Sequence, residues 1–147
     1  MDLIEIYHKT NHFGNENGMK LTIIEPGHIE YRMEILKKHL ATQKAAHGGV
    51  MAAFMDGVLG VAALSEVKDE GKLVATVEFK INYIRPCFLG DKLLGVGKVI
   101  SRGKRILVSD GKIYNHKNEL VCTAIGTFNA YPIDKSDISE FLKKHSF

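Results

Sequence analysis

Cysteine is scarce in this chain of 147 residues, which contains only two. Cys87 and Cys122 lie far apart in the sequence and do not have the spacing of a metal-ligand pair. Their flanking residues are typical of a turn and of a strand. We therefore expect two free, buried thiols in a reducing compartment, and no metal site.

A strong excess of charge is also missing, because the formal net charge is only +3. Nucleic-acid-binding proteins usually concentrate Lys and Arg on one face, with aromatic residues between them. Here the basic residues are scattered, apart from one cluster at Arg102, Lys104 and Arg105. That cluster fits either a solvated turn or a contact with a small polyanion. We expect no nucleic-acid partner.

Long apolar runs and a secretion signal are absent too. Residues 1–8 lack the basic-then-apolar order of a signal peptide. The most apolar run, Val50–Leu64, is about fifteen residues long and contains Asp56, so it is too short and too interrupted to span a membrane. These absences predict a cytoplasmic protein with no membrane partner.

The composition that remains is that of an ordinary globular domain, 45% hydrophobic and 25% charged. A chain of this length can bury a core on its own. It has no internal repeats, low-complexity tracts or composition breaks. We predict one domain, 1–147, with its core at about 19–131.

Alternation of polar and apolar residues and the length of apolar runs predict the secondary structure. A short helix is expected at 3–10, a loop at 12–18, a linker at 37–46, a long helix at 49–67 and a frayed helix at 134–147. Strands are expected at 19–24, 28–36, 73–83, 92–100, 106–115 and 120–131. Within 73–83, strict alternation places Ala75 and Val77 on the apolar face and Thr76 on the polar face.

The helix at 49–67 is apolar on nearly all sides, so it must be buried. A curved antiparallel sheet of about five to six strands, wrapped around the helix, is the economical way to bury it. The sequence therefore predicts an α+β fold with one long central helix enclosed by the sheet.

The start of this helix carries a pattern suited to chemistry. Gly48 and Gly49 let a backbone approach a ligand closely, and peptide N–H groups at a helix N-terminus are unpaired and partly positive. Such a turn can polarise a carbonyl oxygen. The alternative is that His47-Gly48-Gly49 only caps the helix.

Asp56 is the one charged residue between Gly48 and Ser65. At 100° per residue it shares its face with small side chains, whereas large ones occupy the opposite face. The small set is Gly49, Ala52, Ala53, Gly60 and Ala63, and the large set is Met51, Phe54, Met55, Val58 and Val61. Small residues permit close approach by a backbone, a second helix or a ligand. A buried, unpaired carboxylate is costly, so Asp56 has either a function or a hydrogen-bond partner across an interface.

The glycine turn at the start of the helix and the Asp56 carboxylate are separated along the helix. Asp56 lies seven residues after Gly49, about 10 Å along a helix that rises 1.5 Å per residue. A carboxylate at that distance cannot easily act on a carbonyl bound at the start of its own helix. If both serve one reaction centre, we expect a symmetric dimer with two shared sites.

The chain resembles the hotdog-fold thioesterases of the phenylacetate-degradation (PaaI-like) type. The resemblance rests on His47-Gly48-Gly49, on Asp56 nine residues after the His, and on Tyr83-Ile84-Arg85-Pro86 at the end of a long strand. Gly90-Asp91 and Gly103-Lys104-Arg105 also resemble that family. The resemblance covers about residues 21–131 and implies a hotdog fold.

The resemblance implies hydrolysis of acyl-CoA thioesters without a metal or an organic cofactor, coenzyme A being part of the substrate. The Gly48 N–H, next to Gly49, would bind the thioester carbonyl, and His47 would hold the turn. Asp56 from the facing subunit would act as general base on water, or as nucleophile. The Thr76 hydroxyl would orient the water.

The resemblance also implies which residues contact the rest of the substrate. Basic residues would contact the phosphates of coenzyme A, with exposed turn charges as the alternative; the candidates are Arg85, Arg102, Lys104 and Arg105. Many relatives have Asn six residues before the His and Gly three before it, where this chain has Ala41 and Lys44. Thr42 or Gln43 is the candidate substitute for the Asn.

Two other functions stay open at this point. A non-catalytic acyl-CoA binding module on the same fold would fit Ala41 and Lys44, and a hotdog dehydratase would need a second His–acid pair that the sequence does not show. The acyl group is not specified, because apolar residues such as Met51, Met55, Leu59 and Phe79 suit core packing as well as an acyl pocket. The assembly is either a homodimer or a dimer of dimers.

Overall fold

The computed structural model describes residues 2–145. Ten helices and strands follow one another in the order α1 Leu3–Thr10, α2 His12–Glu16, β1 Lys20–Glu25, β2 His28–Glu34, α3 Gly48–Val67, β3 Lys72–Tyr83, β4 Lys92–Arg102, β5 Ile106–Tyr114, β6 Leu120–Pro132 and α4 Ile138–Lys144. Short 3-10 turns lie at Lys37–His39, Lys68–Glu70 and Ile133–Lys135. Of the helix predicted at 134–147, Ile138–Lys144 is confirmed, and a 3-10 turn precedes it. Residues 146–147 of the predicted segment lie outside the described residues.

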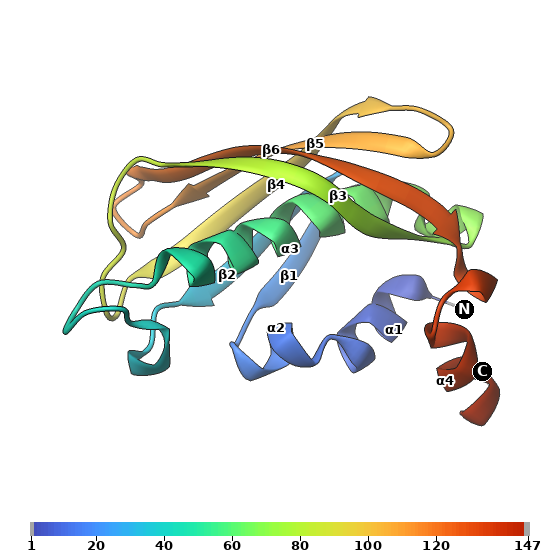
Figure 1. The fold of residues 1–147 in the computed structure, drawn as a ribbon, viewed down its shortest axis with the longest axis horizontal. Coiled ribbons are helices and arrows are strands. Elements are labelled where there is room, and N and C mark those ends of the chain that lie inside the picture. Colours follow the sequence, from blue (N-terminus) through green and yellow to red (C-terminus); the bar gives the residue numbers. More distant parts are fainter. Residues whose placement is uncertain (1, 146–147) are drawn as a thin grey trace.

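The six strands form one antiparallel sheet in the order β1-β2-β4-β5-β6-β3. The sheet curves over α3, as Figure 1 shows. This arrangement confirms the predicted α+β fold with one long helix enclosed by a sheet. The order leaves β1 and β3 as the two edge strands.

The helix packs closely on the sheet because glycines replace side chains where the two meet. A Cβ on Gly97 would lie 2.3 Å from the Val58 carbonyl oxygen, and one on Gly111 would lie 2.7 Å from the Met55 sulfur. Met51, Met55 and Leu59 are at most 3% exposed and belong to this core. Of the two roles open to them, core packing is the one observed.

With the turn that follows it, α3 extends over the 23 residues Gly48–Glu70 and is apolar over most of that length. By length and composition alone this helix could cross a membrane, so the expectation that the segment is too short for a span is wrong. Sequence reasoning counted only the run up to Leu64. In the fold, 61% of its most apolar stretch is buried, as expected for a helix that forms the core.

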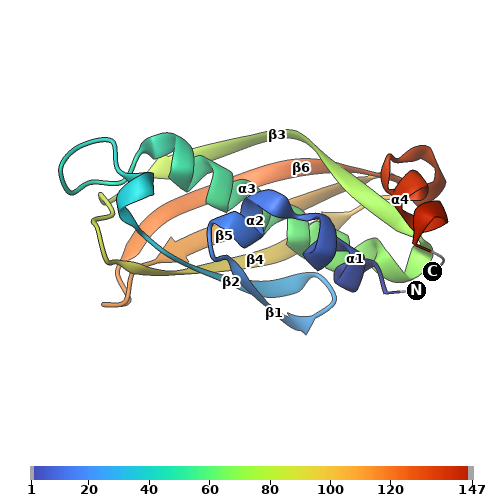
Figure 2. The same ribbon diagram turned by 90° about the horizontal axis from the view of Figure 1, so that it is seen from below.

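The N-terminal helices cover the side of α3 that the sheet leaves open. Seen from below in Figure 2, α1 and α2 lie across α3 between the two edges of the sheet. The helix predicted at 3–10 is confirmed, but the loop predicted at 12–18 is wrong, since α2 occupies most of it. Asn11 caps α2 by accepting a hydrogen bond from the Gly14 N–H (3.1 Å).

β3 departs from strict alternation at one point. Its register with β6 pairs Thr76 with Phe128 and then Glu78 with Thr127, so Val77 is an extra residue in a β-bulge. The bulge turns Thr76 to the same face as the buried Phe128, toward α3, and leaves Val77 59% exposed. The predicted placement of Thr76 on the polar face is therefore wrong, because alternation holds only in a regular strand.

Candidate active site

The turn at the start of α3 presents one free backbone donor. His47 is the N-cap, and its Nδ1 accepts a hydrogen bond from the Gly49 N–H (2.8 Å), while its carbonyl accepts from the Val50 N–H (3.0 Å). Within residues 2–145 no partner bonds the Gly48 N–H. Of the two glycines predicted to contact substrate, Gly48 therefore keeps a free N–H at the positive end of the helix, and Gly49 does not.

Tyr83 joins the end of β3 to this turn. Its hydroxyl donates to the Gly48 carbonyl (2.7 Å), and although the side chain is half exposed, partial desolvation raises the pKa of Tyr83. The bond fixes the peptide next to the free N–H. Sequence reasoning noted Tyr83 only as part of a family pattern, because a contact across 35 positions leaves no signal in the local sequence.

Asp56 and Thr76 form the second part of the site. The Thr76 hydroxyl donates to Asp56 Oδ1 (2.7 Å), so the carboxylate has a partner within its own chain. The β-bulge explains the contact, since it aims Thr76 at α3. The bond occupies one carboxylate oxygen and leaves the other able to accept a proton.

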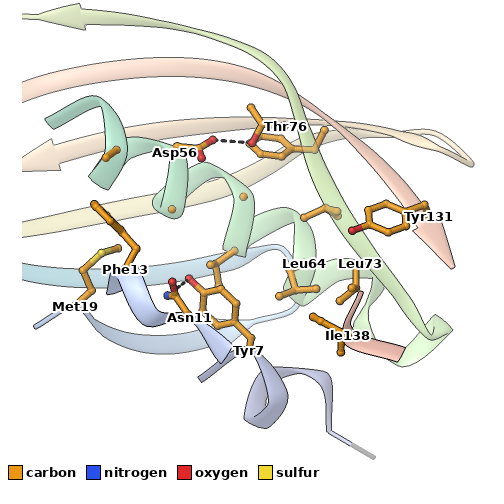
Figure 3. A pocket seen from close by; sticks show the side chains of 16 residues that line it. Tyr7, Asn11, Phe13, Met19, Asp56, Leu64, Leu73, Thr76, Tyr131 and Ile138 are labelled. Atoms are coloured by element: carbon orange, nitrogen blue, oxygen red, sulfur yellow. Dashed lines mark hydrogen bonds between the residues drawn. The ribbon is translucent and has the colours of Figure 1, made fainter. Parts of the chain in front are cut away.

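Asp56 and Thr76 lie on the wall of a cavity of about 520 Å³, a size typical of ligand pockets. Figure 3 shows this pair facing Tyr7 and Asn11 across the cavity. Of the small residues predicted to share the face of Asp56, Ala53 and Gly60 line the cavity. Gly57 lines it as well, and so does Val61, which was predicted on the opposite face. The rest of the wall is mostly apolar and comes from β3, β6, α4 and the N-terminal helices.

The two parts of the site do not meet within one chain. Eight positions of the same helix separate Gly48 from Asp56, which is about 12 Å at 1.5 Å per residue. The structure therefore keeps the spacing that the sequence implied. His47 and Gly48 form one half of a site, and Asp56 with Thr76 forms another.

The four predicted phosphate contacts are divided between the two ends of the molecule. Arg85 follows β3 at the Gly48 end, where its Nε lies 3.8 Å from Glu119 Oε2. Arg102, Lys104 and Arg105 lie at the turn between β4 and β5, at the other end of α3 in Figure 1. One chain does not bring them together.

Arg102 is already occupied by carboxylates. It pairs with Glu66 (Nη1 to Oε1, 3.5 Å) and with Glu70, both at the C-terminal end of α3. Its hydrogen bond and charge hold the pKa of the Glu70 carboxyl below its usual range, and Glu70 raises the pKa of Arg102 in return. Arg102 therefore has ion-pair partners within its own chain, and like Lys104 and Arg105 it is exposed.

Thr42 and Gln43, the candidate substitutes for the Asn found in many relatives, lie in the loop before the turn. The Thr42 hydroxyl accepts from the Ala45 N–H (3.0 Å) and folds the loop on itself. Gln43 is exposed. Neither side chain lines the cavity.

Sequence reasoning missed the cavity wall formed by Tyr7 and Asn11. The available signal was weak: Leu3, Ile4, Ile6 and Tyr7 form an apolar face on α1, but they carry no catalytic pattern. No histidine lines the cavity, and the described residues contain no group of three or more His, Cys, Asp or Glu side chains able to hold a metal ion.

One long helix wrapped by a six-stranded antiparallel sheet defines a hotdog-fold protein. The E. coli PaaI protein of the phenylacetic acid degradation operon has the same fold, with a TM-score of 0.81 and 21% identity over 87% of this chain and 90% of that one. A Streptococcus pneumoniae hypothetical thioesterase, solved with coenzyme A, gives a TM-score of 0.77 at 24% identity over 88% and 97%.

Residues 43–122 match the family model of the thioesterase superfamily. Two relatives are named as esterases. The one from Saccharolobus solfataricus is 31% identical over 78% of this chain and 74% of its own length, and the one from Archaeoglobus fulgidus is 27% identical over 71% and 65%. The chain belongs to the thioesterase superfamily, whose members are thioester hydrolases.

Proposed function

We propose that this protein hydrolyses acyl-CoA thioesters to the free acid and coenzyme A, with Asp56 as general base. The observation that carries the proposal is the Asp56 carboxylate, bonded to Thr76 on the wall of an otherwise uncharged cavity. The coenzyme A bound to the Streptococcus neighbour supports this class of substrate. The reaction needs no metal or organic cofactor.

In this mechanism the Gly48 N–H donates to the thioester carbonyl oxygen and stabilises the negative charge that develops on it. Asp56 takes a proton from a water molecule, which attacks the carbonyl carbon. The carbon–sulfur bond then breaks, and the thiolate of coenzyme A leaves and is protonated. Because Thr76 occupies Oδ1, we assign the proton to Oδ2. The same carboxylate acting as nucleophile is the alternative.

A second copy of the chain completes the site in this proposal. β3 is a twelve-residue edge strand that pairs on one side only, with β6, and Val77 and Tyr83 on it are more than half exposed. Such an edge is a template for pairing with another chain. A homodimer, alone or paired into a dimer of dimers, would bring Asp56 of one chain to the Gly48 turn of its partner.

The cytoplasm is the location we propose for this reaction. Cys87 and Cys122 are buried and unpaired in the described chain. Burial raises the pKa of Cys87 to about 12 and that of Cys122 to about 11, which keeps both thiols protonated and unreactive. We propose neither a nucleic acid nor a membrane as a partner.

Replacing Asp56 by Asn tests the function directly. General-base catalysis contributes about 10²- to 10⁴-fold, so thiol release from a series of acyl-CoAs should fall by about that factor. Asp69→Asn is the matched control, since Asp69 is an exposed carboxylate in the turn after the same helix. Binding of an acyl-CoA without any turnover by the wild type would instead identify a non-catalytic binding protein. Turnover that Asp56→Asn leaves unchanged would refute the mechanism.

A further inference from the structure

A partly buried polar cluster lies across the cavity from Asp56. The hydroxyls of Tyr7 on α1 and Tyr31 on β2 are 2.9 Å apart. The Asn11 amide nitrogen donates to Tyr7 (2.8 Å) and lies 3.3 Å from Tyr31. Tyr7 and Asn11 line the cavity, and Tyr31 lies behind them, 2% exposed.

One hydroxyl proton of this cluster makes no hydrogen bond within it. The Asn11 amide cannot be turned around, because its Oδ1 accepts from the Gly14 N–H. It therefore offers the tyrosines only N–H groups. The two hydroxyls carry two protons, and one of these makes the bond between the two oxygens. Tyr31 is 2% exposed, and among residues 2–145 its hydroxyl has no acceptor other than Tyr7, so we take Tyr31 as the donor to Tyr7. The Tyr7 proton, which no other described group accepts, is then free at the cavity wall.

The charge of the cavity limits what this donor can bind. Asp56 is the one charged side chain among the described residues of the wall. Burial raises the pKa of Tyr7, and the nearby Tyr31 and Asp56 raise it further, so Tyr7 stays a neutral donor. An acyl group ending in a carboxylate would share this apolar cavity with the Asp56 charge and with no cation, which is costly.

We propose that the cavity selects acyl groups that carry a neutral oxygen acceptor, such as a keto or ether oxygen, at the end distant from the thioester. The Tyr7 hydroxyl is the group that donates to this oxygen, and Asn11 and Tyr31 hold it in place. The inference rests on the proposed thioesterase function, since it takes the cavity as the acyl site. It names a specificity-determining residue, not a catalytic one.

The test compares matched sets of three acyl-CoAs with six, eight and ten carbons in the acyl chain. In each set the first acyl group is a plain alkyl chain, the second has a keto oxygen one carbon from its end, and the third ends in a carboxylate. A hydrogen bond of about 1 kcal/mol predicts that the best keto substrate exceeds its alkyl partner in kcat/KM by about fivefold. The carboxylate substrate should fall below both.

Two variants separate this role from a structural one. Tyr7→Phe removes the donor and should make the keto and alkyl substrates equal. Tyr31→Phe removes a hydroxyl of the same cluster but leaves the Tyr7 proton available, so the keto preference should remain. Circular dichroism melting of both variants reports on folding.

The outcomes distinguish this inference from the function on which it rests. If wild type hydrolyses plain alkyl substrates in an Asp56-dependent way and shows no preference for the keto substrates, the inference is overturned and the proposed function stands. A preference that Tyr31→Phe abolishes and Tyr7→Phe keeps, or a preference for the carboxylate substrate, would also overturn it. Absence of all hydrolysis would overturn the function itself.

Discussion

At the scale of single residues, the Thr76 hydroxyl fixes the Asp56 carboxylate (2.7 Å). Thr76→Val keeps the shape of the side chain but removes the donor, so the carboxylate loses its fixed orientation. We expect kcat to fall by about tenfold, within the range that one hydrogen bond to a charged group provides. Thr76→Ser retains the hydroxyl and should stay near wild type. Steady-state thiol release from an acyl-CoA measures both, and equal losses in the two variants would contradict the role.

The Gly48 N–H can be removed without breaking the helix. Gly48 is the first residue of α3, a position where Pro is favoured, and His47 before it already has the extended backbone that Pro requires (φ −67°, ψ 135°). Gly48→Pro should therefore fold and lose about 10²- to 10³-fold in kcat, as removal of one oxyanion donor does.

Gly48→Ala is the matched control for this change. It keeps the N–H, and its added Cβ would meet the Tyr83 ring at 3.7 Å, an ordinary contact distance. We expect near-normal kcat from Gly48→Ala. Full activity in Gly48→Pro, measured in the same assay, would show that the donor has no part in the reaction.

At the scale of elements, the main outline followed from periodicity. The helix predicted at 49–67 is observed at Gly48–Val67, and six strands were expected and are present. The β-bulge was not predictable, because Ala75 and Val77 alternate with polar neighbours as in a regular strand, yet both are exposed. The bulge is set by pairing with β6, which lies far along the chain, and it decides the orientation of Thr76.

The short helix α2 was the second element that the sequence did not predict. α2 contains five residues, including Gly and Asn, which are poor helix formers. It forms because Asn11 caps it, and its neighbour α1 buries Leu3 and Ile6. A short helix that depends on a cap and on tertiary packing has no periodicity to detect. The cavity wall that it helps to build was therefore missed.

The linker before α3 contains a buried histidine that makes stability depend on pH. His39 is 3% exposed. Its Nδ1 accepts from the Leu36 N–H (2.9 Å), its Nε2 contacts Asn17 Oδ1 (2.7 Å), and its carbonyl accepts from the His47 N–H (2.8 Å). Burial and the charge of Lys38 lower the pKa of His39. The neutral ring thus supports the active-site turn.

The direction of the pH effect follows from linkage. Below about pH 6.5 the unfolded chain protonates His39, whereas the folded chain resists until its lower pKa is reached. The free energy of unfolding should therefore fall as pH drops from about 7 through this window. Urea midpoints at several pH values measure it. His39→Gln should flatten the decline, and His12→Gln, a change at an exposed histidine, should not. Parallel curves for wild type and His39→Gln would contradict the assignment.

At the scale of the whole molecule, only one of the two sheet edges lies beside the candidate site. β1 lies beside β2 at one edge, and β3 lies at the other, beside the Asp56–Thr76 pair. The donor turn at Gly48 and the carboxylate are held about 12 Å apart by a rigid helix, so no local motion brings them together. Pairing of two copies is the simplest way to join the halves, and an isologous dimer creates two equal sites.

Two inactive variants should therefore restore each other. Asp56→Asn and Gly48→Pro, co-expressed with different tags and purified through both, give mixed dimers. In each mixed dimer one site combines an intact Gly48 turn with an intact Asp56, and the other has both defects. Acyl-CoA hydrolysis should reach about half of the wild-type rate per dimer. Both homodimers serve as controls and should stay at their low rates. A mixed dimer no more active than its parents would show that each site lies within one chain.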